Sequence, residues 1–165
     1  MNERLVIVVV LGVLCVAGCA DQVPLANDCA QSLVDRATQA FLDAEYEKAR
    51  SLSEEVVHLR PDFAEAWVLH GKSCVLEGDT ASAREAYERA LQLHAERYRT
   101  NPEDTSQLAQ QVYVLLLLRR DTEARALLTQ GLEAHPADER LTLLSSGMGN
   151  LLADEEFRRL CVEQP

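Results

Sequence analysis

The amino-acid sequence predicts an all-α fold, a short solenoid of antiparallel helix pairs. Ala, Leu, Glu and Arg dominate the chain of 165 residues, and all four are strong helix formers. From about residue 29 the apolar residues recur with a helical period, and no stretch alternates as a half-buried strand would. Similar segments also recur at an interval of about 34 residues, which we call the repeat interval and which indicates stacked copies of one helical unit.

Residues 1–18 have the organisation of a secretion signal, a short polar start followed by an uncharged run over 5–18. A membrane-spanning helix needs about 20 apolar residues, so this run is short for a span. Its end, VAGC at 16–19, resembles the lipobox of bacterial lipoproteins. The resemblance implies cleavage between Gly18 and Cys19 and lipidation of the Cys19 thiol. An ordinary secretory signal and an uncleaved anchor are the alternatives.

The residue after the lipidated cysteine often guides sorting in lipoproteins of this kind, and an aspartate there favours the inner membrane. Ala20 occupies this position. The resemblance therefore implies an envelope protein anchored in the outer membrane and facing the periplasm. Residues 19–29 are expected to form the lipidated cysteine and a short tether, with Pro24 and Asn27-Asp28 as breakers.

Three copies of one pattern follow, over residues 30–63, 64–104 and 105–138. The pattern positions are Trp67, Gly71, Ala83, Tyr87 and Ala90 in the middle copy, Ala49 and Pro61 in the first, and Ala124 and Pro136 in the third. This pattern resembles the tetratricopeptide repeat (TPR) family, whose unit is a pair of antiparallel helices. The resemblance implies that small residues let paired helices approach closely and that the prolines end second helices.

The second copy is longer than the first. Pro102 follows Pro61 by more than the repeat interval, and we assign the extra residues to the second helix of this copy, predicted over 80–99. The excess is about seven residues, close to two helical turns, so the buried face stays in phase. We expect this helix to project by about 10 Å and to offer a contact surface. A longer loop over 99–105 is the alternative.

Residues 139–165 are expected to form a degenerate fourth unit that caps the solenoid. The sequence there predicts one helix, a weak point at Gly147 and Gly149, and a closing helix. Such terminal units usually present a polar outer face to solvent.

No catalytic motif is recognisable, so we expect a protein without enzymatic activity, without a cofactor and without a metal site. His70 and Cys74 lie one helical turn apart, but both occupy packing positions of the repeat. A buried structural pair is therefore favoured over metal ligation. The positions of Cys29, Cys74 and Cys161 in the repeats disfavour disulfides, because these need Cα atoms within about 7 Å.

The first helix of each TPR pair lines the concave face, where TPR domains often bind an extended peptide or a helix. Transferring those positions predicts a partner-binding groove formed by Gln31, Thr38, Glu65, Val68, Lys72, Ala109 and Tyr113. Some TPR domains hold a peptide carboxylate with basic and Asn residues. The equivalent positions here are Val34, Thr38, Val68 and Lys72, which disfavours chaperone tails as partners.

The net charge of −11 disfavours nucleic acid as a partner. These observations together predict a membrane-anchored periplasmic scaffold or assembly factor that binds another envelope protein. A pilotin-like factor for a pilus or secretion pore is one alternative, and a structural or ligand-binding lipoprotein is another. The sequence leaves the oligomeric state open.

Overall fold

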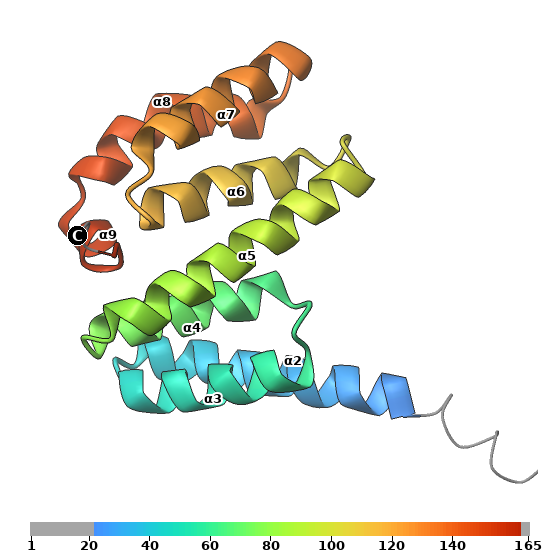
Figure 1. Ribbon diagram of the computed structural model, residues 1–165, viewed down its shortest axis with the longest axis vertical. Coiled ribbons are helices and arrows are strands. Elements are labelled where there is room, and N and C mark those ends of the chain that lie inside the picture. Colours follow the sequence, from blue (N-terminus) through green and yellow to red (C-terminus); the bar gives the residue numbers. More distant parts are fainter. Residues whose placement is uncertain (1–21, 163–165) are drawn as a thin grey trace, which may run out of the picture.

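A computed structural model describes residues 22–162 of the chain, with side chains described from Cys29 onward. Within this range the regular elements are all helices, and consecutive long helices run antiparallel to one another (Figure 1). They are α2 (Gln22–Leu42), α3 (Tyr46–Leu59), α4 (Ala64–Leu76), α5 (Thr80–Thr100), α6 (Thr105–Leu117), α7 (Asp121–Ala134), α8 (Glu139–Ala153) and α9 (Glu155–Arg159). The architecture confirms the predicted all-α solenoid and fits a TPR-like fold.

The first described helix begins earlier than the sequence suggested. Because α2 starts at Gln22, the prediction that Pro24 and Asn27-Asp28 break the chain into a tether is wrong. Pro24 falls in the first turn, where backbone N–H groups have no intrahelical acceptor and a proline costs little. The predicted signal peptide and the lipidation site Cys19 lie outside the described residues.

The prolines of the repeat end the second helices, as predicted. Each second helix stops two residues before a proline: α3 at Leu59 before Pro61, α5 at Thr100 before Pro102, and α7 at Ala134 before Pro136. A proline removes a backbone donor and clashes with the preceding turn, so the helix cannot continue through it.

Small residues lie where the paired helices meet. Ala49, Ala83 and Ala124 are fully buried on the second helices. A Cβ atom on Gly71 of α4 would lie only 2.6 Å from Cδ1 of Tyr87 on α5, so the ring occupies the space that a side chain would need. These positions therefore allow the close approach of the helices that the repeat pattern implies.

The second helix of the second pair has the predicted extra length. α5 has 21 residues, whereas α3 and α7 each have 14. The connection from α5 to α6 is only 101–104, so the alternative of a longer loop is wrong.

The last turns of α5 contact the neighbouring helix pairs on both sides. Arg97 donates to the Asp62 carbonyl at 2.8 Å and to the Glu65 carboxylate at 3.0 Å. One residue later, the Tyr98 hydroxyl lies 3.3 Å from Nε2 of His135, beyond the end of α7. The extension therefore braces the turns of the neighbouring pairs.

The C-terminal unit differs from the prediction. α8 runs unbroken through Gly147 and Gly149, so the predicted weak point is wrong, because a helix tolerates a glycine at a cost of about 1 kcal/mol relative to alanine. The short α9 does not continue the alternation of long paired helices, and the chain after it folds back (Figure 1). The Val162 N–H there donates to the Leu117 carbonyl at 2.9 Å.

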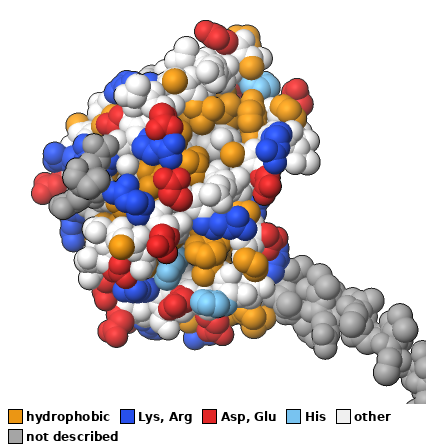
Figure 2. Space-filling view, in the orientation of Figure 1, with side chains coloured by type: hydrophobic (Ala, Val, Ile, Leu, Met, Phe, Trp, Pro, Cys, Tyr) orange, Lys and Arg blue, Asp and Glu red, His pale blue; other side chains and the backbone are white. Residues whose placement is uncertain are grey.

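Charged side chains of both signs are spread over the surface shown in Figure 2. None of the helices in the described part of the chain has both the length and the apolar character that a membrane crossing requires.

Candidate partner-binding groove

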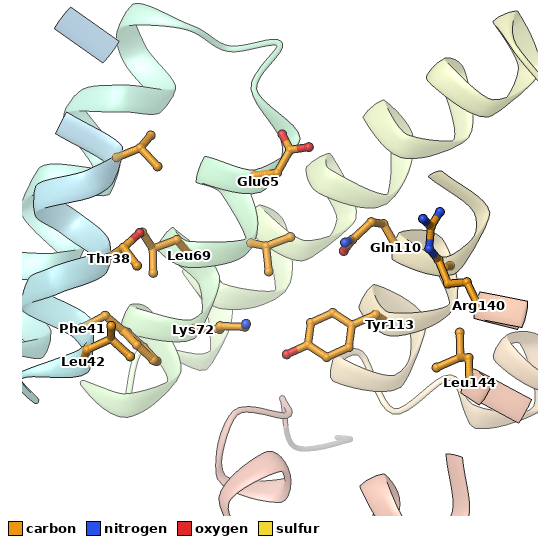
Figure 3. Close-up of a pocket in the computed structure, with 13 residues that line it drawn as sticks. Thr38, Phe41, Leu42, Glu65, Leu69, Lys72, Gln110, Tyr113, Arg140 and Leu144 are labelled. Carbon is orange, nitrogen blue, oxygen red and sulfur yellow. The ribbon is translucent and has the colours of Figure 1, made fainter. Parts of the chain in front are cut away.

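The concave face of the solenoid contains a groove lined by the first helix of each pair. α2, α4, α6 and α8 all contribute to it, and its cavity volume is about 600 Å³ (Figure 3). The lining residues are Val34, Thr38, Phe41, Leu42, Glu65, Val68, Leu69, Lys72, Ala109, Gln110, Tyr113, Arg140 and Leu144. Most of them are apolar, so the groove can remove an apolar surface of a partner from water.

The repeat spacing explains why these residues meet. Val34 and Val68 are separated by the repeat interval, and Ala109 follows Val68 by the longer interval of the extended second copy. Thr38 and Lys72 are again one repeat interval apart, one helical turn further on. Equivalent positions of stacked helices lie next to one another, so each set forms a row across the groove.

Six of the seven residues predicted from the repeat pattern line this groove: Thr38, Glu65, Val68, Lys72, Ala109 and Tyr113. The seventh, Gln31, is exposed outside it, and its side chain donates to Asp35 Oδ1 at 3.2 Å. Contact of any of these residues with a partner stays a prediction.

The sequence-based prediction missed both ends of the groove. Phe41 and Leu42 lie at the C-terminal end of α2, one turn beyond the positions that were transferred. Leu42 is 72% exposed, which leaves a large apolar side chain uncovered at this end. At the other end, Leu144 follows Gln110 by one repeat interval, so the same interval applied to α6 would have found it.

Two cationic side chains belong to the groove wall. The Lys72 ammonium lies 4.9 Å from the ring centroid of Tyr113, a favourable cation–π arrangement across the groove (Figure 3). Arg140 lies on α8, near the far end. Among the described residues neither cation forms a salt bridge, whereas the acidic lining residue Glu65 is bound by Arg97. The groove is therefore locally positive on an acidic protein.

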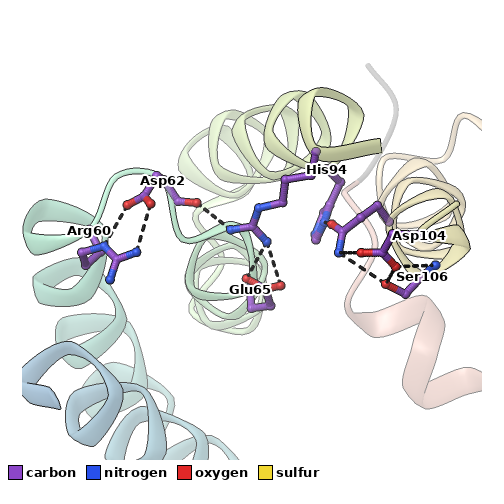
Figure 4. A network of polar contacts seen from close by, with 8 residues as sticks. Arg60, Asp62, Glu65, His94, Asp104 and Ser106 are labelled. Carbon is purple, nitrogen blue, oxygen red and sulfur yellow. Dashed lines mark hydrogen bonds and ion pairs between the residues drawn. The ribbon is translucent and has the colours of Figure 1, made fainter. Parts of the chain in front are cut away.

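A polar network fixes the rim of the groove at the start of α4 (Figure 4). Arg97 of α5 joins the Glu65 carboxylate to the Asp62 carbonyl, and the Arg60 guanidinium binds the Asp62 carboxylate at 2.9 Å. The hydrogen bond from Arg60 lowers the pKa of the Asp62 carboxyl. These contacts hold the turn between α3 and α4 against the extension of α5.

His94 lies in the interior beside this network and is fully buried. Its Nδ1 is 2.9 Å from Gln107 Oε1, and Nε2 has no hydrogen-bond partner among the described residues. Burial lowers the pKa of the imidazole, because the charged form would lose its hydration.

A second buried histidine belongs to the predicted pair with Cys74. His70 Nε2 lies 3.6 Å from Cys74 Sγ, and its Nδ1 lies 3.2 Å from the Ser53 hydroxyl. Burial raises the pKa of the Cys74 thiol to about 11 and lowers the pKa of His70. A reactive cysteine needs access and a lowered pKa, so this cluster has the character of core packing, and the predicted buried pair is confirmed.

The three described cysteines, Cys29, Cys74 and Cys161, are free, as the repeat spacing predicted. No group of three or more His, Cys, Asp or Glu side chains within residues 29–162 is arranged to hold a metal ion.

Comparison with known proteins finds a similarity over nearly the whole chain. No protein-family model matches the chain. The chain is 28% identical over 154 residues to the cytochrome c-type biogenesis protein CycH of Pseudomonas aeruginosa. This alignment covers 93% of the chain but only 33% of the relative, so the chain spans about a third of that protein's length.

Proposed function

We propose that this chain is an assembly factor of the bacterial cell envelope that binds a segment of another protein in its concave groove. The observation that carries this proposal is the groove itself, which is continuous over four first helices and mainly apolar. An array of stacked helix pairs commonly uses such a concave surface for binding. We further propose that the protein has no enzymatic activity.

The groove chemistry indicates what kind of segment binds. Val68 and Ala109 contribute apolar surface to the lining, while Lys72 and Arg140 offer charged groups at separate points of the wall (Figure 3). An amphipathic helix or an extended peptide with an apolar face fits this arrangement. The cavity volume of about 600 Å³ also falls in the range of small-molecule pockets, about 300–1,000 Å³, so a small ligand is the competing occupant.

The similarity to a cytochrome c-type biogenesis protein supports an assembly role. It favours cytochrome c assembly over the pilotin-like alternative, which no observation supports. Because the chain corresponds to only a third of that relative, we carry over the role of assisting assembly and no partner of the whole protein.

Photocrosslinking tests the groove. A photoreactive amino acid at Gln110, an exposed residue of the groove lining, is expected to capture another envelope protein, and the same group at Ser51, exposed on α3, is expected to capture much less. Equal capture at both positions would contradict the proposal. Capture at neither position, together with stabilisation of the protein by small molecules, would favour the ligand-binding alternative.

We also propose that Cys19 anchors the protein by lipid to the outer membrane, on the periplasmic side. The experiment is intact mass and membrane fractionation of the chain beside Cys19→Ser in a Gram-negative host. The expected result is loss of residues 1–18 and gain of acyl mass in the wild-type chain only. A wild-type chain that keeps residues 1–18, or carries no lipid, would contradict the lipid anchor. It would not bear on the proposal that the groove binds a partner.

A further inference from the structure

α8 occupies the place of a first helix, but nothing in the described chain covers it as a second helix. Ala37, Gly71 and Val112 hold equivalent positions in α2, α4 and α6, and all three are buried. The next member of this series, one repeat interval after Val112, is Ser146, and Ser146 is exposed.

A second series of equivalent positions shows the same contrast between buried residues in α2, α4 and α6 and an exposed residue in α8. Ala40, Cys74 and Leu115 are at most 5% exposed, yet their equivalent Gly149 is exposed. In the complete pairs the cover comes from the second helix, as at Gly71, where the Tyr87 ring fills the space. α9 is too short to supply this cover.

The uncovered surface, which we call the open face of α8, carries no charge after Glu139, the first residue of the helix. It consists of exposed side chains at helical spacing: Thr142, Leu143, Ser146, Gly149, Asn150 and Ala153. No charged residue occurs between Arg140 and Asp154, although 26% of the chain is charged. Leu143 is 70% exposed, which makes it one of three exposed large apolar side chains in the described part of the chain.

We propose that the open face of α8 binds the same face of a second copy of this chain, with the two α8 helices antiparallel. Two chains of charge −11 repel one another, and the uncharged stretch between Arg140 and Asp154 is the place where the fewest like charges meet, with Glu139 of one copy near Asp154 of the other only at the ends of the contact. The sequence of the face is also complementary to itself. When Ser146 lies on the twofold axis, Leu143 and Gly149 stand three residues on either side, so each Leu143 meets the Gly149 of the other copy.

Cysteine crosslinking of the full chain tests both the contact and its register. Ser146→Cys in a Cys29→Ser background, oxidised in whole cells, is expected to give a disulfide-linked dimer. Ser51→Cys on α3, which is also exposed, measures random collision in the same background and is expected to give at least fivefold less crosslinked dimer. A dimer yield from Ser146→Cys no greater than that of Ser51→Cys, or a crosslink mainly to another protein, would overturn the proposal.

The register is tested by co-expressing Leu143→Cys and Gly149→Cys chains with different tags. The antiparallel arrangement predicts mixed dimers, whereas two copies of residue 143 would lie about 9 Å apart along the helices, too far for a disulfide. Abundant Leu143→Cys dimers in cells without the Gly149→Cys chain would contradict this register.

Sedimentation of the solubilised full chain gives an independent readout. Leu143→Glu places a charge on each side of the axis and is expected to convert dimer to monomer while the thermal unfolding temperature of the monomer stays unchanged. A wild-type chain that sediments as a monomer at all concentrations tested would overturn the proposal. Dimerisation is also expected to strengthen with added salt, which screens the repulsion between the acidic bodies.

Discussion

The hydroxyl of Tyr87 donates a 2.8 Å hydrogen bond to the carbonyl of Leu160, a residue 73 positions later in the chain. Tyr87 is fully buried on α5, and Leu160 follows α9. This bond ties the end of the chain to the second helix pair instead of leaving it beside α8. The same bond is one reason why α9 cannot cover the open face of α8.

Tyr87→Phe is expected to lower the free energy of unfolding by about 1–2 kcal/mol, because it leaves the Leu160 carbonyl without its partner. Urea unfolding followed by circular dichroism measures the change. Tyr46→Phe is the control, since no hydrogen bond of the Tyr46 hydroxyl occurs among the described residues, and a shift below about 0.5 kcal/mol is expected there. Equal shifts in the two variants would show that the Tyr87 bond contributes nothing specific.

The repeat pattern of the sequence predicted the fold because each copy repeats the same physical requirements. A small residue at position 71, a large ring at 87 and a proline at 102 together specify two close helices and their end. The length of α5 followed from counting residues between Pro61 and Pro102. Such local and periodic signals need no knowledge of distant contacts.

Features that depend on contacts between distant segments were missed. The return of the chain at Leu160 depends on Tyr87, and no periodicity connects these two positions. The groove residues Phe41 and Arg140 were missed for a different reason, since only some repeat positions were transferred: Phe41 lies one turn after Thr38, and Arg140 is the equivalent of Glu65 in the degenerate unit. The early start of α2 differs from the prediction because the first turn of a helix accommodates Pro24.

Two glycines in first helices are expected to respond to alanine in opposite directions. Gly71→Ala is expected to destabilise the protein by about 1–3 kcal/mol, because the new Cβ collides with the buried Tyr87 ring. Gly147→Ala is expected to stabilise it by about 0.5–1 kcal/mol, since a Cβ there meets no atom within 4 Å and alanine favours the helix. Thermal unfolding of both variants under one buffer tests the contrast, and a stabilised Gly71→Ala protein would mean that the two helices can separate without cost.

In the turns within the first two helix pairs, residues at equivalent repeat positions have a left-handed backbone conformation, with positive φ. Gly78 has φ +84° in the turn after α4, and Ala44, one repeat interval earlier, has φ +60° in the turn after α2. In this region the Cβ atom of alanine comes too close to the backbone, whereas glycine has no Cβ atom. Ala44→Gly is therefore expected to raise the free energy of unfolding by up to about 1 kcal/mol, and Gly78→Ala to lower it by about the same amount. Urea unfolding of both variants measures the two changes in the free energy of unfolding. Two changes of the same sign would contradict the assignment of strain to Ala44.

The stability of the protein is expected to fall as the pH decreases below about 6.5, the pKa of an unfolded histidine. Burial lowers the folded-state pKa of His94 and of His70, so the unfolded chain binds protons that the folded chain does not. The contribution of each histidine is complete above the unfolded pKa and is lost as the pH falls toward the folded pKa. For one such histidine the slope reaches at most about 1.4 kcal/mol per pH unit.

His94→Gln isolates one of these contributions. A glutamine can still donate to Gln107 but does not titrate, so the free energy of unfolding of the variant is expected to depend less steeply on pH between about 6.5 and 5.5. Glu65 raises the pKa of His94 and Arg97 lowers it, so these two neighbours act in opposite directions. Urea unfolding at four pH values gives both slopes. Parallel slopes for the wild type and the variant would show that His94 takes up no additional proton on unfolding, and would assign the wild-type slope to other groups.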